Sequence, residues 1–303
     1  MAEKQEVNCP VCDRKSYRVL YEAWIDEKDP KKLYGAATGI QGTQRIVKCN
    51  DCGMIYENPR FPKEVILEGY INTEQSLHDS QYKNRVKSFY KALEKLKEHL
   101  PMKGARVLDI GTAGGAFLEA ATQFGYDAYG LEPSLYLSQE STKRGLKILQ
   151  GTIDENSFPD KHFDMVCLWD VIEHLVEPKE SKESLLKIRR LLKPEGLLLI
   201  NYPDIGTWMA KATGKRFWWI LSVHLHHFDR KTITKICDLT GFKVFMFKPY
   251  WQTLDFGYLI DMAVRYRIPL AKTFKQILPN AIKNIPVPYY ASQTTALARM
   301  VNE

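Results

Sequence analysis

Apolar runs and amphipathic segments alternate between residues 106 and 249. Short, mostly apolar runs bounded by turns or polar residues predict buried strands, and apolar residues at every third or fourth position predict helices. We expect strands near 106–110, 127–131, 146–149, 163–168, 196–201 and 242–248, and helices near 115–124, 134–144, 178–192 and 231–239. This alternation is typical of a parallel sheet with crossover helices. A final strand at 294–301 is expected to pair antiparallel.

The rest of the chain divides around this core. Residues 63–100 predict a helical linker, because apolar positions such as Val86, Phe89 and Leu93 recur at helical spacing. Two insertions, 202–228 and 250–290, interrupt the pattern, and Pro279 is expected to kink or split a helix in the second. We therefore predict a small module at 1–62 and an α/β domain at 63–303.

The first predicted strand of the core carries Asp109 and leads into a loop of small residues. Gly111, Ala113 and Gly115 let the backbone turn sharply and approach a ligand, and a helix begins after them. The next strand ends at Glu132, where a carboxylate can accept both hydroxyls of a ribose. An acid before the first glycine is unusual for a dinucleotide site. It suits a nucleoside ligand that carries ammonium and sulfonium cations in place of a pyrophosphate.

At these motifs the chain resembles the class I S-adenosylmethionine-dependent methyltransferases, from about Phe89 to Lys248. The resemblance rests on three sequences, Val-Leu-Asp-Ile-Gly-Thr-Ala-Gly-Gly-Ala-Phe-Leu, Gly-Leu-Glu-Pro-Ser and Phe-Asp-Met-Val-Cys-Leu-Trp-Asp-Val-Ile-Glu-His-Leu. It implies a Rossmann-like seven-stranded sheet and S-adenosylmethionine as cofactor. The chain departs from the family at Ala113, where glycine is usual, and at Thr152, where many members carry an acid that contacts the adenine. A Rossmann domain that only binds its ligand is the alternative.

Ligands of open α/β sheets bind beyond the carboxyl ends of the strands, and this rule places the expected cofactor contacts. Trp169 fits a core aromatic residue as well as a pocket wall. The contacts are Asp109, Gly111, Ala113 and Gly115 for the methionine part, Glu132 and Pro133 for the ribose, Thr152 and Ile153 for the adenine, and Trp169 and Asp170 beside the reactive methyl group.

Four of the six cysteines form two C-x-x-C pairs, Cys9 with Cys12 and Cys49 with Cys52. Together they supply four sulfur ligands for a tetrahedral Zn²⁺ of structural type, because no coordination position remains open. Two disulfides or redox pairs are the alternative, which a chain without a leader disfavours. With these two pairs, the chain resembles a subgroup of bacterial methyltransferases that carry an amino-terminal zinc-ribbon-like module and are often tied to the modification of sugars, polysaccharides, lipids or secondary metabolites.

Two histidine-containing segments offer a catalytic base. Asp170, Glu173 and His174 form a D-x-x-E-H sequence, which in the quinone O-methyltransferases resembles a divalent-metal site and which also fits acids at a helix N-terminus. A second segment, His224-Leu-His226-His227, follows the fifth strand of the core. Histidine suits proton removal near neutral pH. We take His226, His227 and His174 as the candidate bases.

Composition adds limits on partners. The 303 residues are 45% hydrophobic and 26% charged, and the net formal charge of +7 permits an acidic substrate or an anionic surface without indicating nucleic acid. No amino-terminal apolar signal and no stretch of about 20 apolar residues is present, so we expect a cytoplasmic protein. The aromatic residues around Trp208 and Trp218, and the amphipathic stretch 274–285, fit either packing on the sheet or contact with a membrane surface.

We therefore expect methyl transfer to an oxygen of a small-molecule, sugar or glycan, or lipid-linked acceptor. One alternative is an RNA methyltransferase that docks nucleic acid with the zinc ribbon, although residues 1–60 hold no dense Lys/Arg stripe. Another is a cofactor-binding scaffold without turnover. The sequence leaves the oligomeric state open.

Overall fold

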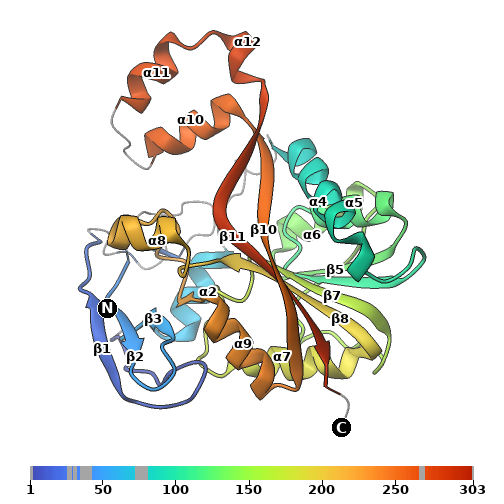
Figure 1. Cartoon of the computed structure of the whole chain (residues 1–303), viewed down its shortest axis with the longest axis horizontal. Helices are drawn as coiled ribbons and strands as arrows, with labels where there is room; N and C mark the ends of the chain where they lie inside the picture. Colours follow the sequence, from blue (N-terminus) through green and yellow to red (C-terminus); the bar gives the residue numbers. More distant parts are fainter. Residues whose placement is uncertain are drawn as a thin grey trace.

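A computed structural model describes residues 3–25, 29, 33–34, 43–71, 81–265 and 270–301. Their strands form two sheets, one of seven strands and one of four. The large sheet lies at the centre of the molecule with helices on both faces, and the small sheet lies beside it near the amino terminus (Figure 1).

The large sheet has the order β10-β11-β8-β7-β4-β5-β6. The strands from β8 to β6 are parallel, and β11 runs antiparallel to both of its neighbours. This confirms the predicted Rossmann-like fold with its one reversed strand. Because β4 lies between β5 and β7, the segments that follow β4 and β7 diverge and leave a crevice at their carboxyl ends. The strands are β4 (Arg106–Ile110), β5 (Asp127–Glu132), β6 (Lys147–Gln150), β7 (Phe163–Trp169), β8 (Leu192–Pro203), β10 (Phe242–Asp255) and β11 (Pro286–Met300).

Alternate residues of the central strands supply two cores. Val107, Met165 and Leu197 pack with α4 and α5 on one face, and their neighbours in sequence pack with α7 and α9 on the other. Strands buried on both faces explain the nearly continuous apolar runs in the sequence. The helices are α4 (Tyr82–Leu96), α5 (Ala116–Phe124), α6 (Leu135–Lys143), α7 (Glu180–Leu191) and α9 (Arg230–Leu239), and η1 (Lys97–His99) follows α4.

The small sheet joins distant parts of the chain. Three of its strands come from the amino-terminal module, β1 (Tyr17–Tyr21), β2 (Ile46–Cys49) and β3 (Ile55–Glu57), and the fourth is β9 (His226–His227). Tyr56 lies opposite His226 in an antiparallel pair. The end of the first predicted insertion, where we expected no strand, therefore forms one. The helix α2 (Lys63–Ile71) follows the module. Arg60, at the end of the module, connects it to the main domain, because its Nη1 donates a hydrogen bond of 2.6 Å to the carbonyl oxygen of Val176.

The two insertions differ from the expectation in one respect. The strands β10 and β11 do not stop near Tyr250 but continue as a pair to Asp255 opposite Pro286. Their far end carries α10 (Phe256–Arg265), α11 (Ala271–Ile277) and α12 (Asn280–Lys283), and Pro279 separates the last two, as expected (Figure 1). The first insertion contains α8 (Trp208–Thr213) and η2 (Gly214–Arg216). After them, the indole N–H groups of Trp218 and Trp219 donate to the carbonyl oxygen of Ala291 in β11, so both rings pack against the large sheet.

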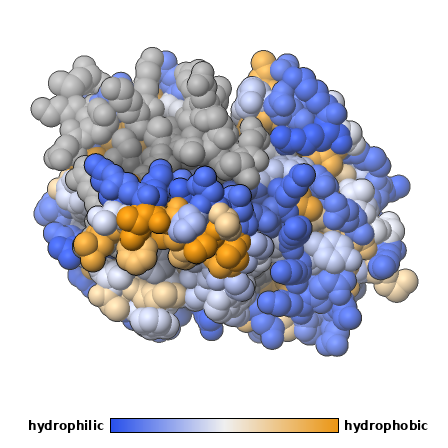
Figure 2. Space-filling model, turned by 90° about the horizontal axis from the view of Figure 1, so that it is seen from above, coloured by the Kyte–Doolittle hydropathy of each residue, from blue (hydrophilic) through white to orange (hydrophobic). Residues whose placement is uncertain are grey.

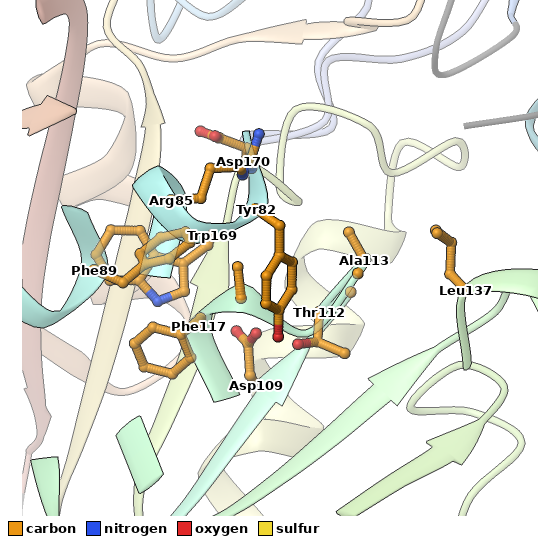
Figure 3. Close-up of a pocket in the computed structure, with 13 residues that line it drawn as sticks. Tyr82, Arg85, Phe89, Asp109, Thr112, Ala113, Phe117, Leu137, Trp169 and Asp170 are labelled. Carbon is orange, nitrogen blue, oxygen red and sulfur yellow. The ribbon is translucent and has the colours of Figure 1, made fainter. Parts of the chain in front are cut away.

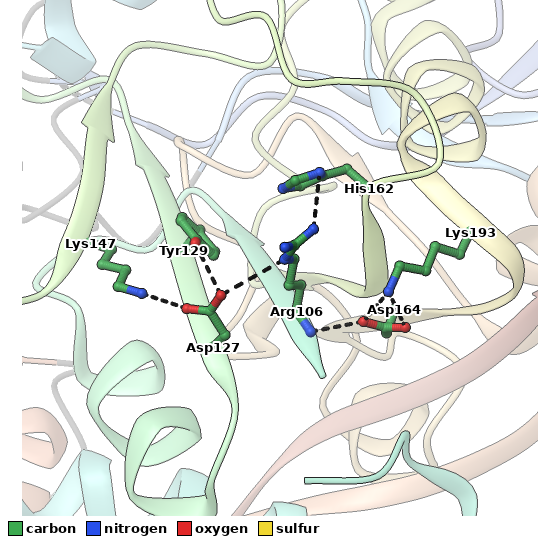
Figure 4. A network of polar contacts seen from close by, with 7 residues as sticks. All are labelled: Arg106, Asp127, Tyr129, Lys147, His162, Asp164 and Lys193. Carbon is green, nitrogen blue, oxygen red and sulfur yellow. Dashed lines mark hydrogen bonds and ion pairs between the residues drawn. The ribbon is translucent and has the colours of Figure 1, made fainter. Parts of the chain in front are cut away.

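Charged side chains connect the amino ends of the central strands (Figure 4). Asp127 at the start of β5 accepts from Lys147 at 2.5 Å, and Asp164 accepts from Lys193 at 2.7 Å and from the Arg106 backbone at 2.8 Å. These pairs are partly exposed, so each contributes little to stability. They occupy the edge of the sheet opposite the crevice.

The described helices are short. The longest, α4, has 15 residues. Within the described part of the chain, no helix combines the length and the apolar character needed to cross a bilayer.

Candidate active site

A narrow pocket opens at the carboxyl end of β4. Figure 3 shows Phe89, Phe117 and Trp169 on one side of it, Ala113 and Leu137 on the other, and the Tyr82 ring above Asp109. Asp109 is 1% exposed, and its Oδ1 has no hydrogen-bond partner among the described residues. A buried carboxylate oxygen without a donor is costly unless a ligand supplies one, so this pocket suits a cationic group.

Burial raises the pKa of Asp109 to about 8, with the nearby Thr112 hydroxyl opposing and the Glu132 carboxylate adding to the rise. The ligand-free protein therefore holds Asp109 largely protonated at neutral pH. An ammonium group placed against it would favour the ionised form.

The loop after β4 depends on small residues. Gly111 has a φ of 69°, and a Cβ there would lie 2.8 Å from Val171 Cγ2. Ala113 also has a positive φ, 49°, a backbone conformation that glycine adopts at lower cost than alanine. Gly115 precedes α5 with a φ of 78°, and the absence of a side chain lets Leu146 approach it closely. Contrary to expectation, Gly115 does not line the pocket. The loop is thus fixed in one conformation by its neighbours.

Glu132 at the end of β5 is engaged by the backbone. Its Oε2 accepts from Ala113 N–H and its Oε1 from Ser134 N–H, both at 2.8 Å. Burial raises the pKa of Glu132 despite these two donors. Each oxygen keeps a second acceptor direction. Glu132 therefore ties the small-residue loop to β5, and its contact with a ribose stays a prediction.

A second, larger cavity of about 630 Å³ continues from the first, because Gly111 and Asp170 line both. Pro133, Thr152 and Ile153 line it, where we expected the ribose and adenine of a nucleoside. Its opposite wall comes from residues that the sequence did not identify, among them Tyr34 of the amino-terminal module and Ile66 and Leu67 of α2. A cavity of this size accommodates a ligand as large as a drug molecule.

Asp170 lies where the two cavities meet. Its Oδ1 accepts from Asn201 at 3.0 Å and from Gln293 at 2.6 Å, and its φ is 54°. Burial raises the pKa of Asp170 to about 6, and the charge of Arg85 together with the two amide donors opposes that rise. Figure 3 shows Arg85 of α4 beside it. Asp170 thus has a fixed orientation between β7, β8 and β11.

Trp169 combines the two roles proposed for it. It lines the narrow pocket, and its ring packs against Phe89 at a centroid distance of 5.0 Å and against Tyr250 at 5.1 Å. Tyr82 and Arg85, which line the same pocket, were missed from the sequence. The Tyr82 hydroxyl donates to Glu119 at 2.6 Å.

Glu173, His174 and His224 form a group beside the large cavity, in which Glu173 and His224 are buried and His174 is half-buried. One ligand atom from each lies within 4.8 Å of the others, and Asp170 is not part of the group. Neither carboxylate oxygen of Glu173 has a hydrogen-bond partner among the described residues. A backbone carbonyl orients each histidine. Nδ1 of His174 lies 3.0 Å from the carbonyl oxygen of Val223, and Nδ1 of His224 lies 2.8 Å from that of Trp219.

The electrostatics of this group follow from burial. Burial raises the pKa of Glu173, and the charge of Asp170 adds to that rise. Burial lowers the pKa of His174 to about 4, and burial also lowers the pKa of His224. His174 is therefore a neutral imidazole at pH 7, and of the three it is the residue that lines the large cavity.

His226 and His227 have a different place. Both are buried in β9, and neither lines either cavity. His226 Nε2 lies 3.3 Å from Arg60 Nη1, so this histidine belongs to the contact between the module and the main domain. Burial lowers the pKa of His227 to about 4. Of the three candidate bases, the geometry favours His174.

The four cysteines of the amino-terminal module come together. The sulfur of Cys9 lies 3.4 Å from that of Cys52, and Cys12 lies 3.5 Å from Cys49. All four sulfur atoms lie within 4.8 Å of one another, and none forms a disulfide. A tetrahedral zinc with Zn–S bonds of about 2.3 Å requires sulfur atoms about 3.8 Å apart. The donor set and its spacing fit such an ion.

Comparison with known proteins agrees with the fold. Residues 79–245, more than half of the chain, match the family described as a methyltransferase domain. The chain belongs to this family, and its seven-stranded sheet is that of the class I S-adenosylmethionine-dependent methyltransferases. A solved S-adenosylmethionine-dependent methyltransferase from Archaeoglobus fulgidus has the same fold, with a TM-score of 0.51 and 18% identity over 74% of this chain and 99% of that one.

Several relatives carry the name ubiquinone biosynthesis O-methyltransferase. The mitochondrial protein of Dictyostelium discoideum is 25% identical over 218 residues, which is 62% of this chain and 66% of the relative. The protein of Roseobacter denitrificans is 31% identical over 163 residues, which is 47% of this chain and 64% of the relative. The chain thus spans less than two thirds of the length of these relatives.

Proposed function

We propose that this chain transfers a methyl group from S-adenosylmethionine to an oxygen of a small-molecule, sugar or lipid-linked acceptor. The observation that carries the proposal is the buried Asp109, whose Oδ1 has no hydrogen-bond partner among the described residues. It lines the narrow pocket beside Gly111, and Gly111 also borders the large cavity that His174 lines. The names of the relatives, which are O-methyltransferases, support an oxygen as the methylated atom.

The residues of the two cavities fit the parts of the cofactor. Asp109 faces the place for an ammonium group, and Trp169 and Asp170 border the place for the reacting centre. Thr152 and Ile153 offer a hydroxyl and an apolar contact to the adenine. When bound, S-adenosylmethionine supplies a methyl group on a positively charged sulfur, which keeps the electron pair of the broken bond.

His174 removes the proton of the acceptor hydroxyl in this proposal. Its imidazole is neutral because burial lowers its pKa to about 4, so a lone pair is available at neutral pH. The proton moves from the acceptor oxygen to the imidazole as that oxygen gains the methyl group. A modest base is sufficient, because alignment of the two substrates supplies much of the acceleration.

We also propose that Cys9, Cys12, Cys49 and Cys52 bind a structural Zn²⁺. The sulfur spacing supports this, and four protein ligands leave no position for substrate. Tyr34 of the same module lines the large cavity and donates to Glu57 at 2.8 Å. The metal would therefore stabilise one wall of the large cavity.

The test uses the full chain with methyl-labelled S-adenosylmethionine and a cell extract, followed by mass spectrometry of the products. We expect label on an oxygen of a small molecule or a lipid-linked sugar. His174→Gln should lower kcat about 10²- to 10⁴-fold and leave cofactor affinity unchanged. The matched control is His162→Gln, at the opposite edge of the sheet. Label in RNA, or no cofactor binding by calorimetry, would overturn the proposal.

A further inference from the structure

Residues 256–265 and 270–285 form a cap of three short helices at the far end of the β10–β11 pair (Figure 1). The helix α10 packs against α11 and α12. Several large apolar side chains of the cap face solvent, and Figure 2 shows an apolar strip on this face beside hydrophilic residues. These side chains are Leu270, Phe274, Ile277, Ile282 and Ile285. Leu270 exposes 74% of its surface and Ile277 exposes 69%.

This strip requires an explanation, because single domains seldom expose neighbouring large apolar residues. The helices α11 and α12 have seven and four residues, too short for stable isolated helices. None of the five side chains belongs to the two hydrophobic cores that lie on the faces of the large sheet. An external surface is needed to cover them.

The charge of the cap indicates which surface that is. Residues 256–285 contain five basic residues and one acidic residue, a net charge of +4 out of +7 for the whole chain. The acid, Asp261, pairs with Lys275 at 2.9 Å, which leaves the remaining basic residues in excess. Lysines beside an exposed apolar strip are typical of helices that lie in the interface of an anionic bilayer.

We propose that the cap docks onto the surface of an anionic phospholipid bilayer. Phe274 and Ile277 enter the boundary between headgroups and acyl chains, and Lys272 and Lys283 contact the lipid phosphates. A second copy of the chain fits less well, because two surfaces of +4 charge repel each other.

Docking at the cap also places the active site near the bilayer. Asp255, at the base of the cap, accepts from Gln81 at 3.1 Å and from Asn84 at 2.9 Å, next to the start of α4. The same helix contributes Tyr82 and Arg85 to the narrow pocket. The docking itself does not depend on methyl transfer and is tested without it.

The experiment is vesicle flotation of the full chain with phosphatidylcholine vesicles, with and without phosphatidylglycerol. We expect binding to the anionic vesicles that weakens as salt rises. The double variant Phe274→Ser with Ile277→Ser should lower the bound fraction about tenfold or more, because each loses a buried apolar side chain. The matched control exchanges Leu186 and Leu239, exposed by 47% and 53% on α7 and α9, for serine and should bind as the original does.

A second pair of variants isolates the charge. Lys272→Glu with Lys283→Glu should abolish the preference for phosphatidylglycerol, and Lys95→Glu with Lys231→Glu should retain it. Thermal unfolding verifies that each variant is folded. Failure of the original chain to float with anionic vesicles would overturn the proposal. So would a lipid-free dimer, seen by light scattering, that the serine variant at Phe274 and Ile277 disrupts, since a second copy would then be the occupant.

Discussion

Replacing Asp109 by asparagine should make the ligand-free protein more stable and the cofactor complex weaker. In the folded chain, burial raises the pKa of Asp109 from 3.8 to about 8. Between these two pH values the folded state keeps a proton that the unfolded state loses. Stability therefore falls as the pH rises from about 4 to about 8, and it is highest below that window.

The size of the effect follows from the same pKa. The ordinary pKa of 3.8, which applies to the unfolded chain, lies 3.2 pH units below pH 7. At about 1.4 kcal/mol for each unit, Asp109 lowers the stability of the folded state by about 4 kcal/mol at pH 7. Asparagine does not ionise, but its buried amide carries a penalty of about 1–2 kcal/mol. We expect Asp109→Asn to raise the free energy of unfolding by about 2–3 kcal/mol at pH 7, which corresponds to a Tm increase of about 5 °C.

The cofactor complex should respond in the opposite direction. A hydrogen bond from an ammonium to a carboxylate contributes about 1.5–3 kcal/mol, so Asp109→Asn should weaken binding of S-adenosylhomocysteine about 10- to 100-fold. Thermal unfolding between pH 5 and 9 without ligand, and calorimetry with it, measure the two effects. Glu132→Gln is the control, because both oxygens of Glu132 already accept backbone N–H groups, and it should destabilise the protein. The reasoning fails if Asp109→Asn is less stable than the original chain at pH 7, or binds with unchanged affinity.

Further changes test the rest of the structure. Ala113→Gly should stabilise the protein by about 0.5–1 kcal/mol in urea unfolding, because it relieves a φ of 49°; a loss of stability would argue against this loop conformation. Cys12→Ser, or a strong chelator, should release one zinc per chain by elemental analysis and lower Tm, whereas no bound metal would contradict the proposed site. Arg60→Met removes the donor to the Val176 carbonyl oxygen and should cost about 3–5 kcal/mol by denaturant unfolding; a neutral effect would show that this buried contact is unimportant. The rate should fall only below about pH 5, where His174 begins to gain a proton, given its pKa of about 4; a fall already at pH 6.5 would exclude that residue as the base.

The fold of the core was predictable because each of its strands has a local signal. Apolar runs that end at Asp109, Glu132 and Trp169 give both the strands and the edge where the site lies. The extension of β10 past Pro249 was not predictable in this way. A proline lacks a backbone donor and usually ends a strand, but β10 is at the edge of the sheet, where that donor would face away from its neighbour.

The site was predictable only where its residues follow a strand of the core. Asp109, Pro133, Thr152 and Asp170 line the cavities for that reason. Tyr82 and Arg85 lie on an amphipathic helix whose polar residues have no local feature that separates a pocket from solvent. The two-residue strand β9 has no periodic pattern at all, since it exists through its pairing with Ile55 and Tyr56. That distant pairing removed His226 and His227 from the crevice.

The participation of β9 in the amino-terminal sheet has a consequence for biosynthesis. During translation the two cysteine pairs leave the ribosome long before the segment that completes their sheet. The module waits, with one sheet edge uncovered, until most of the catalytic domain has been made. Its order of synthesis and its order of completion are therefore different, and the two parts of this chain reach their final form together.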